Sequence, residues 1–242
     1  MWEGPGEPDA EAVLRMTGPV HHQLAHVYRL QPGDEAVAVT PAGRELVLEL
    51  LAVTAHETRA RVRQTRVPAT EAGAAVTLAV AAPRGPRMDW LVEKAGELGA
   101  AAIQPLWAER GIVPPEAVDQ RTERWRRKAA AATVQSRRAL QMSFLSGARL
   151  DEAVAAFCGP SFIAHVGAAV SLPDALRTAP GTHRLLLAVG PEGGFTAAEV
   201  GAAVAQGGVA VGLGPRILRV ETAALAMLAA TMALLGEWDA RG

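Results

Sequence analysis

The chain has 242 residues and half of them are hydrophobic, which suffices for one large domain or two small ones. Charged residues make up 20% and the formal net charge is -1, a balance that excludes a disordered or fibrous protein. The single cysteine, Cys158, excludes an internal disulfide and a cysteine metal cluster, and we expect no metal site from the six histidines.

The first twelve residues are acidic and turn-forming, whereas a secretory signal begins with positive charge followed by an apolar run. The longest uncharged apolar run, residues 223–235, is shorter than the roughly 20 residues that a membrane helix needs. We therefore expect a cytoplasmic protein in which this run forms a buried helix.

Residues from about 20 to 67 have the composition of short β-strands separated by turns at 31–34 and 41–43. The expected strands are Glu35–Val39, Glu45–Val53 and Thr58–Val67. Residues 68–73 lack apolar periodicity and are the expected domain boundary. The pattern predicts a small β-barrel domain over residues 1–70 and a second domain over residues 71–242.

In the second domain, short apolar runs alternate with helical stretches, which predicts an α/β fold with a parallel sheet covered by helices on both faces. Strands are expected at 75–82, 101–107, 162–167, 185–190 and 209–214. Helices are expected at Asp89–Leu98, at Asp119–Ala139, after the N-cap Thr196, and from Thr222 to Gly236. The last helix repeats Leu225, Leu228, Met232 and Leu235 along one side, which fits packing on its own sheet or on a second subunit.

Two glycine-bearing turns follow neighbouring strands of this predicted sheet. The turn at 190–194 lies between a strand and a capped helix, where α/β proteins bind nucleotides, but it has neither the P-loop nor the GxGxxG pattern. Glu192 disfavours a phosphate there and favours a neutral or cationic ligand. The turn at 212–215 precedes Arg219 and Glu221, and two such turns at adjacent strand ends predict one cleft. Taken alone, the first turn also fits a plain connection, and Arg219 with Glu221 fits a surface ion pair.

The pairing of GPEGGFTAAE (190–199) with LGPRILRVETAAL (213–225) resembles the small-subunit (16S) ribosomal RNA uracil-N3 methyltransferases, a branch of the SPOUT class of knotted methyltransferases. ELGAAAIQPLWAERG (97–111), QSRR (135–138) and HVGA (165–168) follow in the family's order and spacing. The resemblance implies a PUA-like β-barrel followed by a SPOUT α/β domain with a C-terminal trefoil knot. It also implies S-adenosylmethionine as cofactor, no metal, and a homodimer.

By this resemblance, the cofactor lies among three loops at 165–168, 189–194 and 213–222. The residues implied to bind it are Val166, Gly167, Val189, Gly190, Pro191, Glu192, Gly193, Leu213, Gly214, Ile217, Leu218 and Thr222.

Methylation at uracil N3 requires loss of the imide proton, after which the nitrogen attacks the methyl group in line with the sulfonium sulfur. The protein must hold both groups in line and stabilise negative charge on the uracil oxygens. We expect Arg219 in the substrate or cofactor pocket and Arg138 at the target nucleotide or its phosphate. Glu221 either orients Arg219 or accepts a proton.

Two basic segments predict an RNA partner, either small-subunit ribosomal RNA or the assembled 30S particle. Arg59, Arg61 and Arg63 alternate along a strand and therefore share one face. Residues 121–138 hold seven basic residues and one acidic residue, which also fits a solvated helix face. The expected RNA-binding residues are Arg29, which matches the family pattern, together with Arg59, Arg61, Arg63, Arg126, Arg127 and Arg137. Trp125 on this helix either stacks on a base or belongs to the core.

Three other functions compete with this reading. The same cofactor loops would serve a knotted methyltransferase that acts on another RNA. A non-catalytic RNA-binding module could keep the fold without turnover. A nicotinamide-dependent oxidoreductase is disfavoured because the dinucleotide fingerprint is missing.

Overall fold

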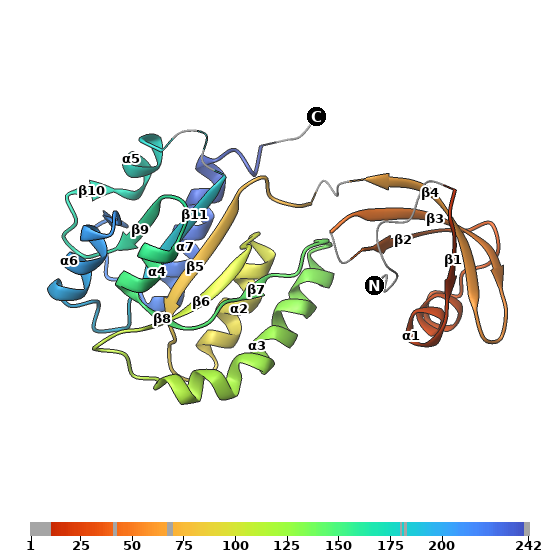
Figure 1. Ribbon diagram of the computed structural model, residues 1–242, viewed down its shortest axis with the longest axis horizontal. Helices are drawn as coiled ribbons and strands as arrows, with labels where there is room; N and C mark the ends of the chain where they lie inside the picture. The colour runs from red at the N-terminus through yellow and green to blue at the C-terminus, as the bar shows by residue number, and fades with distance from the viewer. Residues whose placement is uncertain (1–10, 41–42, 67–69, 180, 182, 240–242) are drawn as a thin grey trace. The chain divides into compact units, whose positions relative to one another are not determined.

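The computed structural model describes residues 11–40, 43–66, 70–179, 181 and 183–239. Most of the acidic N-terminal segment, part of the turn at 41–43, the strand end at Val67 and part of the expected boundary at 68–73 lie outside the described residues. The chain divides into two compact units (Figure 1). The N-terminal unit comprises residues up to 71 together with residues 137–140, and the α/β unit comprises residues 72–136 and those from 141 onward.

The N-terminal unit contains an antiparallel sheet with the strand order β1, β4, β3, β2. These strands are β1 (Val13–Met16), β2 (Glu35–Val39), β3 (Glu45–Val53) and β4 (Thr58–Arg66). The expected bounds of β2 and β3 are confirmed. In β3, apolar residues alternate with less buried ones, so Leu46, Leu48 and Leu50 lie on one buried face.

The chain between β1 and β2 departs from the prediction of extended structure. It forms the helix α1 (Gly18–His22) and the π-helix η1 (Gln23–Val27). Val20 and Leu24 are four residues apart, so the helical conformation turns both of them toward the core of the sheet. Pro19 also fits the first helical turn, where its missing N–H costs no hydrogen bond.

The α/β unit is built on an eight-stranded sheet in which every pairing is parallel. The strand order is β10, β12, β9, β11, β5, β6, β7, and β8 also pairs with β6. The five expected strands are present as β5 (Ala75–Ala81), β6 (Ala102–Trp107), β9 (Ser161–Ala164), β11 (Arg184–Val189) and β12 (Val209–Gly212). The sequence did not predict the two-residue strands β7 (Ser143–Phe144), β8 (Ala148–Arg149) and β10 (Val170–Ser171).

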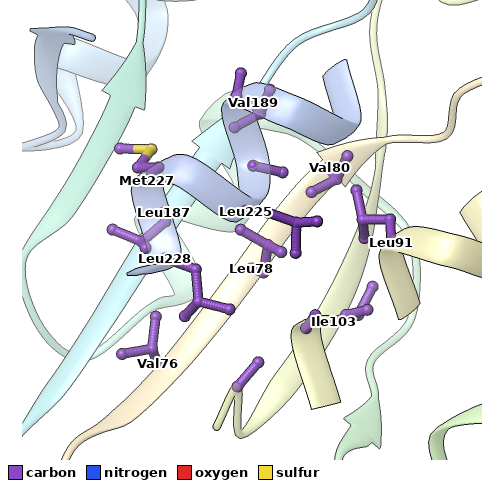
Figure 2. Close-up of a cluster of buried hydrophobic side chains, with 14 of the residues drawn as sticks. Val76, Leu78, Val80, Leu91, Ile103, Leu187, Val189, Leu225, Met227 and Leu228 are labelled. Atoms are coloured by element: carbon purple, nitrogen blue, oxygen red, sulfur yellow. The ribbon is translucent and has the colours of Figure 1, made fainter. Parts of the chain in front are cut away.

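Helices cover both faces of this sheet, as predicted. They are α2 (Arg87–Glu97), α3 (Pro115–Gln135), α4 (Leu150–Ala156), α5 (Leu172–Arg177), α6 (Ala197–Ala205) and α7 (Val220–Leu234). Leu187 and Val189 of β11 share a core with α2, α5 and α7 (Figure 2), whereas Leu186 points into a second core with α4 and α6. Successive side chains of β11 therefore point to opposite faces of the sheet, and helices pack against both faces.

The helix ends expected from the sequence can be compared with the structure at three helices. The capping box at Thr196 is confirmed, because its hydroxyl accepts the Glu199 N–H while the Glu199 carboxylate accepts the Thr196 N–H. Helix α3 begins and ends four residues earlier than predicted, since Pro115 fits the first turn and Arg137 has a left-handed φ of 57°. Helix α7 begins at Val220, so Glu221 lies in its first turn.

The apolar side of α7 is covered within the same chain. Leu225, Leu228 and Met232 are buried in the core against β5, β11, α2 and α5. These side chains therefore do not offer a surface to a second subunit. None of the helices in the described part of the chain is long and apolar enough to cross a membrane.

Candidate functional site

A cavity of about 740 Å³ lies at the carboxyl ends of β9, β11 and β12. Its walls are the loops that follow these strands, over residues 164–171, 189–195 and 212–218. The three strands are close together in the sheet, because β9 pairs with both β11 and β12. The volume and position are those of a small-molecule site in an open α/β sheet.

The cavity brings together the residues that the sequence assigned to a cofactor. All of them line it except Thr222, which is exposed in the first turn of α7. Each of the three loops contains one glycine with a positive φ: Gly167 at 82°, Gly194 at 69° and Gly214 at 93°. Only glycine adopts this backbone region without strain, so the glycines shape the walls of the cavity.

Two arginines fix the loop that follows β11. Arg110 Nη1 donates a 2.9 Å hydrogen bond to the Gly193 carbonyl oxygen, and Arg87 Nη1 lies 3.4 Å from Glu192 Oε1. Sequence reasoning assigned neither arginine to the site. Arg110 falls within the matched segment 97–111, but no spacing in the sequence indicates that the loop after β6 reaches Gly193.

Glu221 is buried and lies close to Arg87. Its Oε1 lies 3.9 Å from Arg87 Nε, and its buried Oε2 accepts no hydrogen bond from any residue that the structure describes. The structure shows no ion pair between Glu221 and Arg219 over the same residues. Arg219 is exposed at the N-cap of α7 and does not line the cavity, although Leu218 and Val220 on either side do.

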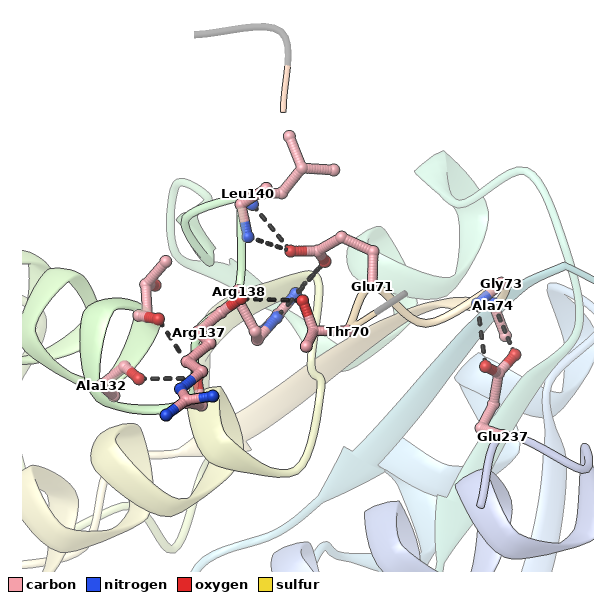
Figure 3. Close-up of polar contacts among 12 residues, drawn as sticks. Thr70, Glu71, Gly73, Ala74, Ala132, Arg137, Arg138, Leu140 and Glu237 are labelled. Atoms are coloured by element: carbon pink, nitrogen blue, oxygen red, sulfur yellow. Dashed lines mark hydrogen bonds and ion pairs between the residues drawn. The ribbon is translucent and has the colours of Figure 1, made fainter. Parts of the chain in front are cut away.

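Arg138 belongs to the N-terminal unit and is buried, with 6% of its side chain exposed. Its Nη2 lies 3.2 Å from Glu71 Oε2, while Glu71 Oε1 accepts the N–H groups of Ala139 and Leu140 at 2.6 and 2.8 Å (Figure 3). The structure therefore holds Arg138 in a buried ion pair rather than at the surface of its unit.

The arginines of β4 share one face, as predicted, while Ala60 and Val62 between them are buried. The sequence did not indicate that glutamates from other segments pair with them. The ion pairs on this face are Arg59–Glu57, Arg61–Glu11, Arg63–Glu11, Arg63–Glu49 and Arg66–Glu45, with Arg15–Glu57 beside them. Hydrogen bonds from Arg15 and then Arg59 lower the pKa of Glu57, which keeps this carboxylate charged.

The basic residues of α3 divide into paired and unpaired groups. Arg124 pairs with Asp89, and Arg126 lies 3.7 Å from Glu123. Arg121, Arg127 and Lys128 form no ion pair within the described chain. Arg29 and Arg137 are both exposed. Trp125 is 2% exposed and donates a 3.0 Å hydrogen bond to Asp89, so it belongs to the core.

Three histidines of the N-terminal unit, His21, His22 and His26, lie near one another. His22 and His26 are four residues apart, and their ring centroids are separated by 5.1 Å. His21 Nδ1 lies 2.9 Å from the Thr58 hydroxyl. Over the residues described, no group of three or more histidine, cysteine or acidic side chains is arranged to hold a metal ion.

Comparison with known proteins assigns the chain to a family. A family model described as an RNA methyltransferase domain matches residues 70–232. A protein of Bacillus subtilis (strain 168) named ribosomal RNA small subunit methyltransferase E is 32% identical over 227 residues, which cover 89% of this chain and 88% of the relative. The chain belongs to the ribosomal RNA small subunit methyltransferase E family.

Further members of the methyltransferase E family support the same assignment. The protein of that name from Mycobacterium tuberculosis (strain CDC 1551 / Oshkosh) is 34% identical over 244 residues, covering 96% of this chain and 91% of its own. A crystal structure of methyltransferase E from Neisseria gonorrhoeae bound to S-adenosyl methionine is 30% identical, with a TM-score of 0.78 over 95% of each chain. The family-model match begins near the start of the α/β unit and includes all three cavity loops.

Proposed function

We propose that this protein uses S-adenosylmethionine to methylate N3 of one uridine in small-subunit ribosomal RNA. The observation that carries the proposal is the single cavity formed by three glycine-bearing loops, which are the segments matched to the family. Relatives named as small-subunit ribosomal RNA methyltransferases support the substrate, and the S-adenosyl methionine in the Neisseria structure supports the cofactor.

The residues of the cavity fit this cofactor. Glu192 is the only carboxylate among the described residues that line it, and a carboxylate attracts a positively charged ligand. Val166 and Ile217 line it from different loops although they are 83% and 90% exposed, so an apolar ligand surface can bury both. S-adenosylmethionine, when bound, supplies a methyl group on a positively charged sulfur.

The protein's own residues then bind and orient the reacting groups. The loops at 165–168, 189–194 and 213–222 would hold the cofactor through backbone amides and carbonyls, with Thr222 at the end of the third loop. Of the two roles expected for Glu221, accepting the imide proton is supported over orienting Arg219, because its buried Oε2 has no hydrogen-bond partner in the described chain. Glu221 is not itself among the residues that line the cavity, so the proton must reach it from the cavity wall. Arg219 contacts the substrate from the N-cap of α7. A contact of Arg138 with the target nucleotide requires that it leave Glu71.

RNA binding is assigned to exposed arginines of both units. In the N-terminal unit these are Arg29, Arg59, Arg63 and Arg137, together with the half-buried Arg61, and in the α/β unit they are Arg126 and Arg127 on α3. Phosphates would compete with the glutamates that pair with the β4 arginines. Arg127 forms no ion pair in the described chain, which makes it available to phosphate.

The proposal includes the family's architecture. The N-terminal unit is a PUA-like β-barrel, and the α/β unit is a SPOUT domain with a C-terminal trefoil knot. The strand order supports the knot, because β12 lies beyond β9 while α7 returns to pack on β11 and β5. The active form is a homodimer located in the cytoplasm, where ribosomal RNA is found.

The proposal is tested by mapping methylated nucleotides in ribosomal RNA from cells that lack this protein. We expect one N3-methyluridine to disappear from the small subunit and to return when purified protein and S-adenosylmethionine are added to the unmodified particles. Methyl transfer to transfer RNA instead would assign the enzyme to another RNA. Calorimetry that detects no binding of S-adenosylmethionine would favour the non-catalytic module, and binding of NAD instead would favour the oxidoreductase.

A further inference from the structure

Four titratable side chains occur among the described residues that line the cavity: Arg110, His165, Glu192 and Arg216. Arg110 is bonded to the Gly193 carbonyl, and Glu192 is paired with Arg87. Arg216 forms no ion pair and no side-chain hydrogen bond with any residue that the structure describes. Arg216 is therefore an arginine of the cavity lining that has no ion pair within the described chain.

Arg216 belongs to one of the three loops that form the cavity. It lies in the exposed loop between β12 and α7, two residues after Gly214, whose φ of 93° turns the chain, and directly after Pro215, whose ring restricts the backbone. Arg219, in contrast, is at the helix N-cap and does not line the cavity. Of the two arginines in this segment, Arg216 is the one that lines the cavity.

A positive ligand alone gives no reason for an unneutralised guanidinium here, because like charges repel. The proposed reaction, however, produces an anion in the same space. When uracil loses its N3 proton, the negative charge spreads onto the two carbonyl oxygens that flank N3. A guanidinium offers several N–H donors in one plane, which suits hydrogen bonding to such an oxygen.

We propose that Arg216 is a catalytic residue that donates hydrogen bonds to a uracil oxygen beside N3 and stabilises the negative charge formed during methyl transfer. The inference rests on the proposed function. Two other anionic groups have similar chemistry, the carboxylate of S-adenosylmethionine and an RNA phosphate, and the experiment separates them from the uracil oxygen.

The test compares Arg216→Ala and Arg216→Lys with the wild-type protein and with Arg177→Ala. Arg177 is an exposed arginine of α5 that pairs with Asp174 and does not line the cavity, so it controls for loss of one charge. Single-turnover methyl transfer to unmodified small-subunit particles is measured across a pH series, and the dissociation constant of S-adenosylmethionine is measured by calorimetry.

We expect Arg216→Ala to lower the single-turnover rate about 100-fold, as loss of one donor to a developing oxyanion does in other enzymes. Affinity for S-adenosylmethionine should stay unchanged, Arg216→Lys should recover part of the rate, and Arg177→Ala should match the wild type. Because Arg216 favours the anionic form of uracil, its loss should also move the rise in rate to higher pH. The other ionisable groups at or beside the cavity, His165, Glu192 and Glu221, are present in both proteins.

Three results would overturn the inference. A rate and pH profile like those of the wild type would remove Arg216 from the reaction. A weaker affinity for S-adenosylmethionine would assign Arg216 to the cofactor carboxylate. A change confined to the particle concentration that gives half the maximal single-turnover rate, and to the salt dependence of that concentration, would assign it to a phosphate. If the wild-type protein itself transferred no methyl group, the proposed function would fail instead.

Discussion

At the scale of single residues, Asp89 of α2 makes two polar contacts with α3. Its Oδ1 accepts the indole N–H of the buried Trp125, and its other oxygen pairs with the exposed Arg124. Asp89→Ala would leave the indole N–H without its acceptor, which costs about 1–3 kcal/mol. Urea unfolding of the variant should show this loss in the free energy of unfolding.

Arg124→Ala separates the two halves of that contact. Its side chain is 60% exposed, so the ion pair should contribute less than about 1 kcal/mol. In a Trp125→Phe background, Asp89→Ala should cost less than in the wild type, because the donor is already absent. Equal losses for Arg124→Ala and Asp89→Ala would show that the ion pair, and not the buried hydrogen bond, holds the helices together.

The residues of the site were predictable to different degrees. The cavity glycines follow strands of one parallel sheet, and strand ends meet at one edge whatever the details of packing. That Arg216 lines the cavity and Arg219 does not was not predictable, since the two lie three residues apart with similar sequence surroundings. Arg110 was missed because its loop reaches Gly193 only through tertiary packing.

At the scale of elements, Glu11 extends the pairing of β1 with β4 and places a carboxylate between two arginines. Its N–H donates to the Val62 carbonyl oxygen at 2.9 Å, and its φ of 71° is in the left-handed region. The carboxylate lies 3.5 Å from both Arg61 and Arg63. Because both arginines are proposed to bind phosphate, Glu11 competes with RNA for them.

Glu11→Gln should therefore raise RNA affinity at low salt by about two- to fivefold, the size expected when one exposed ion pair no longer has to be broken. Fluorescence anisotropy with a labelled fragment of small-subunit RNA would measure this, and the gain should vanish at high salt. Glu35→Gln is the matched control, because Glu35 lies on the same face, opposite Glu49, and forms no ion pair in the described chain. An equal gain in both variants would show that RNA affinity rises because of the change in net charge and not because Arg61 and Arg63 are released from Glu11.

Some strands and helices could be predicted from the sequence, and others could not. Strands β2, β3, β5 and β11 were predictable to within one residue, because each carries a complete apolar pattern bounded by turn residues. The two-residue strands β7, β8 and β10 are too short to have any period. The helices at 18–27 were missed because the only helical signal there is the spacing of Val20 and Leu24, while the surrounding residues lack a helical face.

At the scale of the whole molecule, the division into two units was expected near residue 70, but the return of residues 137–140 to the N-terminal unit was not. The helix expected over residues 119–139 included most of the segment 137–140. The return depends on Glu71, which binds the backbone of Ala139 and Leu140, and on the Leu140 side chain, which lies against Gly43. Such contacts join residues far apart in the chain and leave no periodic signal in the sequence.

Two carboxylates fix the chain near the boundary, one in each unit, and they allow a reciprocal experiment. Glu71 accepts the N–H groups of Ala139 and Leu140, while Glu237 accepts those of Gly73 and Ala74 at 2.9 Å (Figure 3). Glu71→Ala should speed amide hydrogen exchange at 139–140 about tenfold or more, because those N–H groups lose their acceptor.

Glu237→Ala should have the corresponding effect at 73–74 and leave 139–140 protected. Exchange measured by mass spectrometry on the intact protein would report both sites in each variant. The Glu71 variant should also unfold at a lower temperature, because it removes a carboxylate that is paired with the buried Arg138. If either variant raised exchange equally at both sites, the two carboxylates would act on one cooperative structure, and the division into separately stabilised units would be wrong.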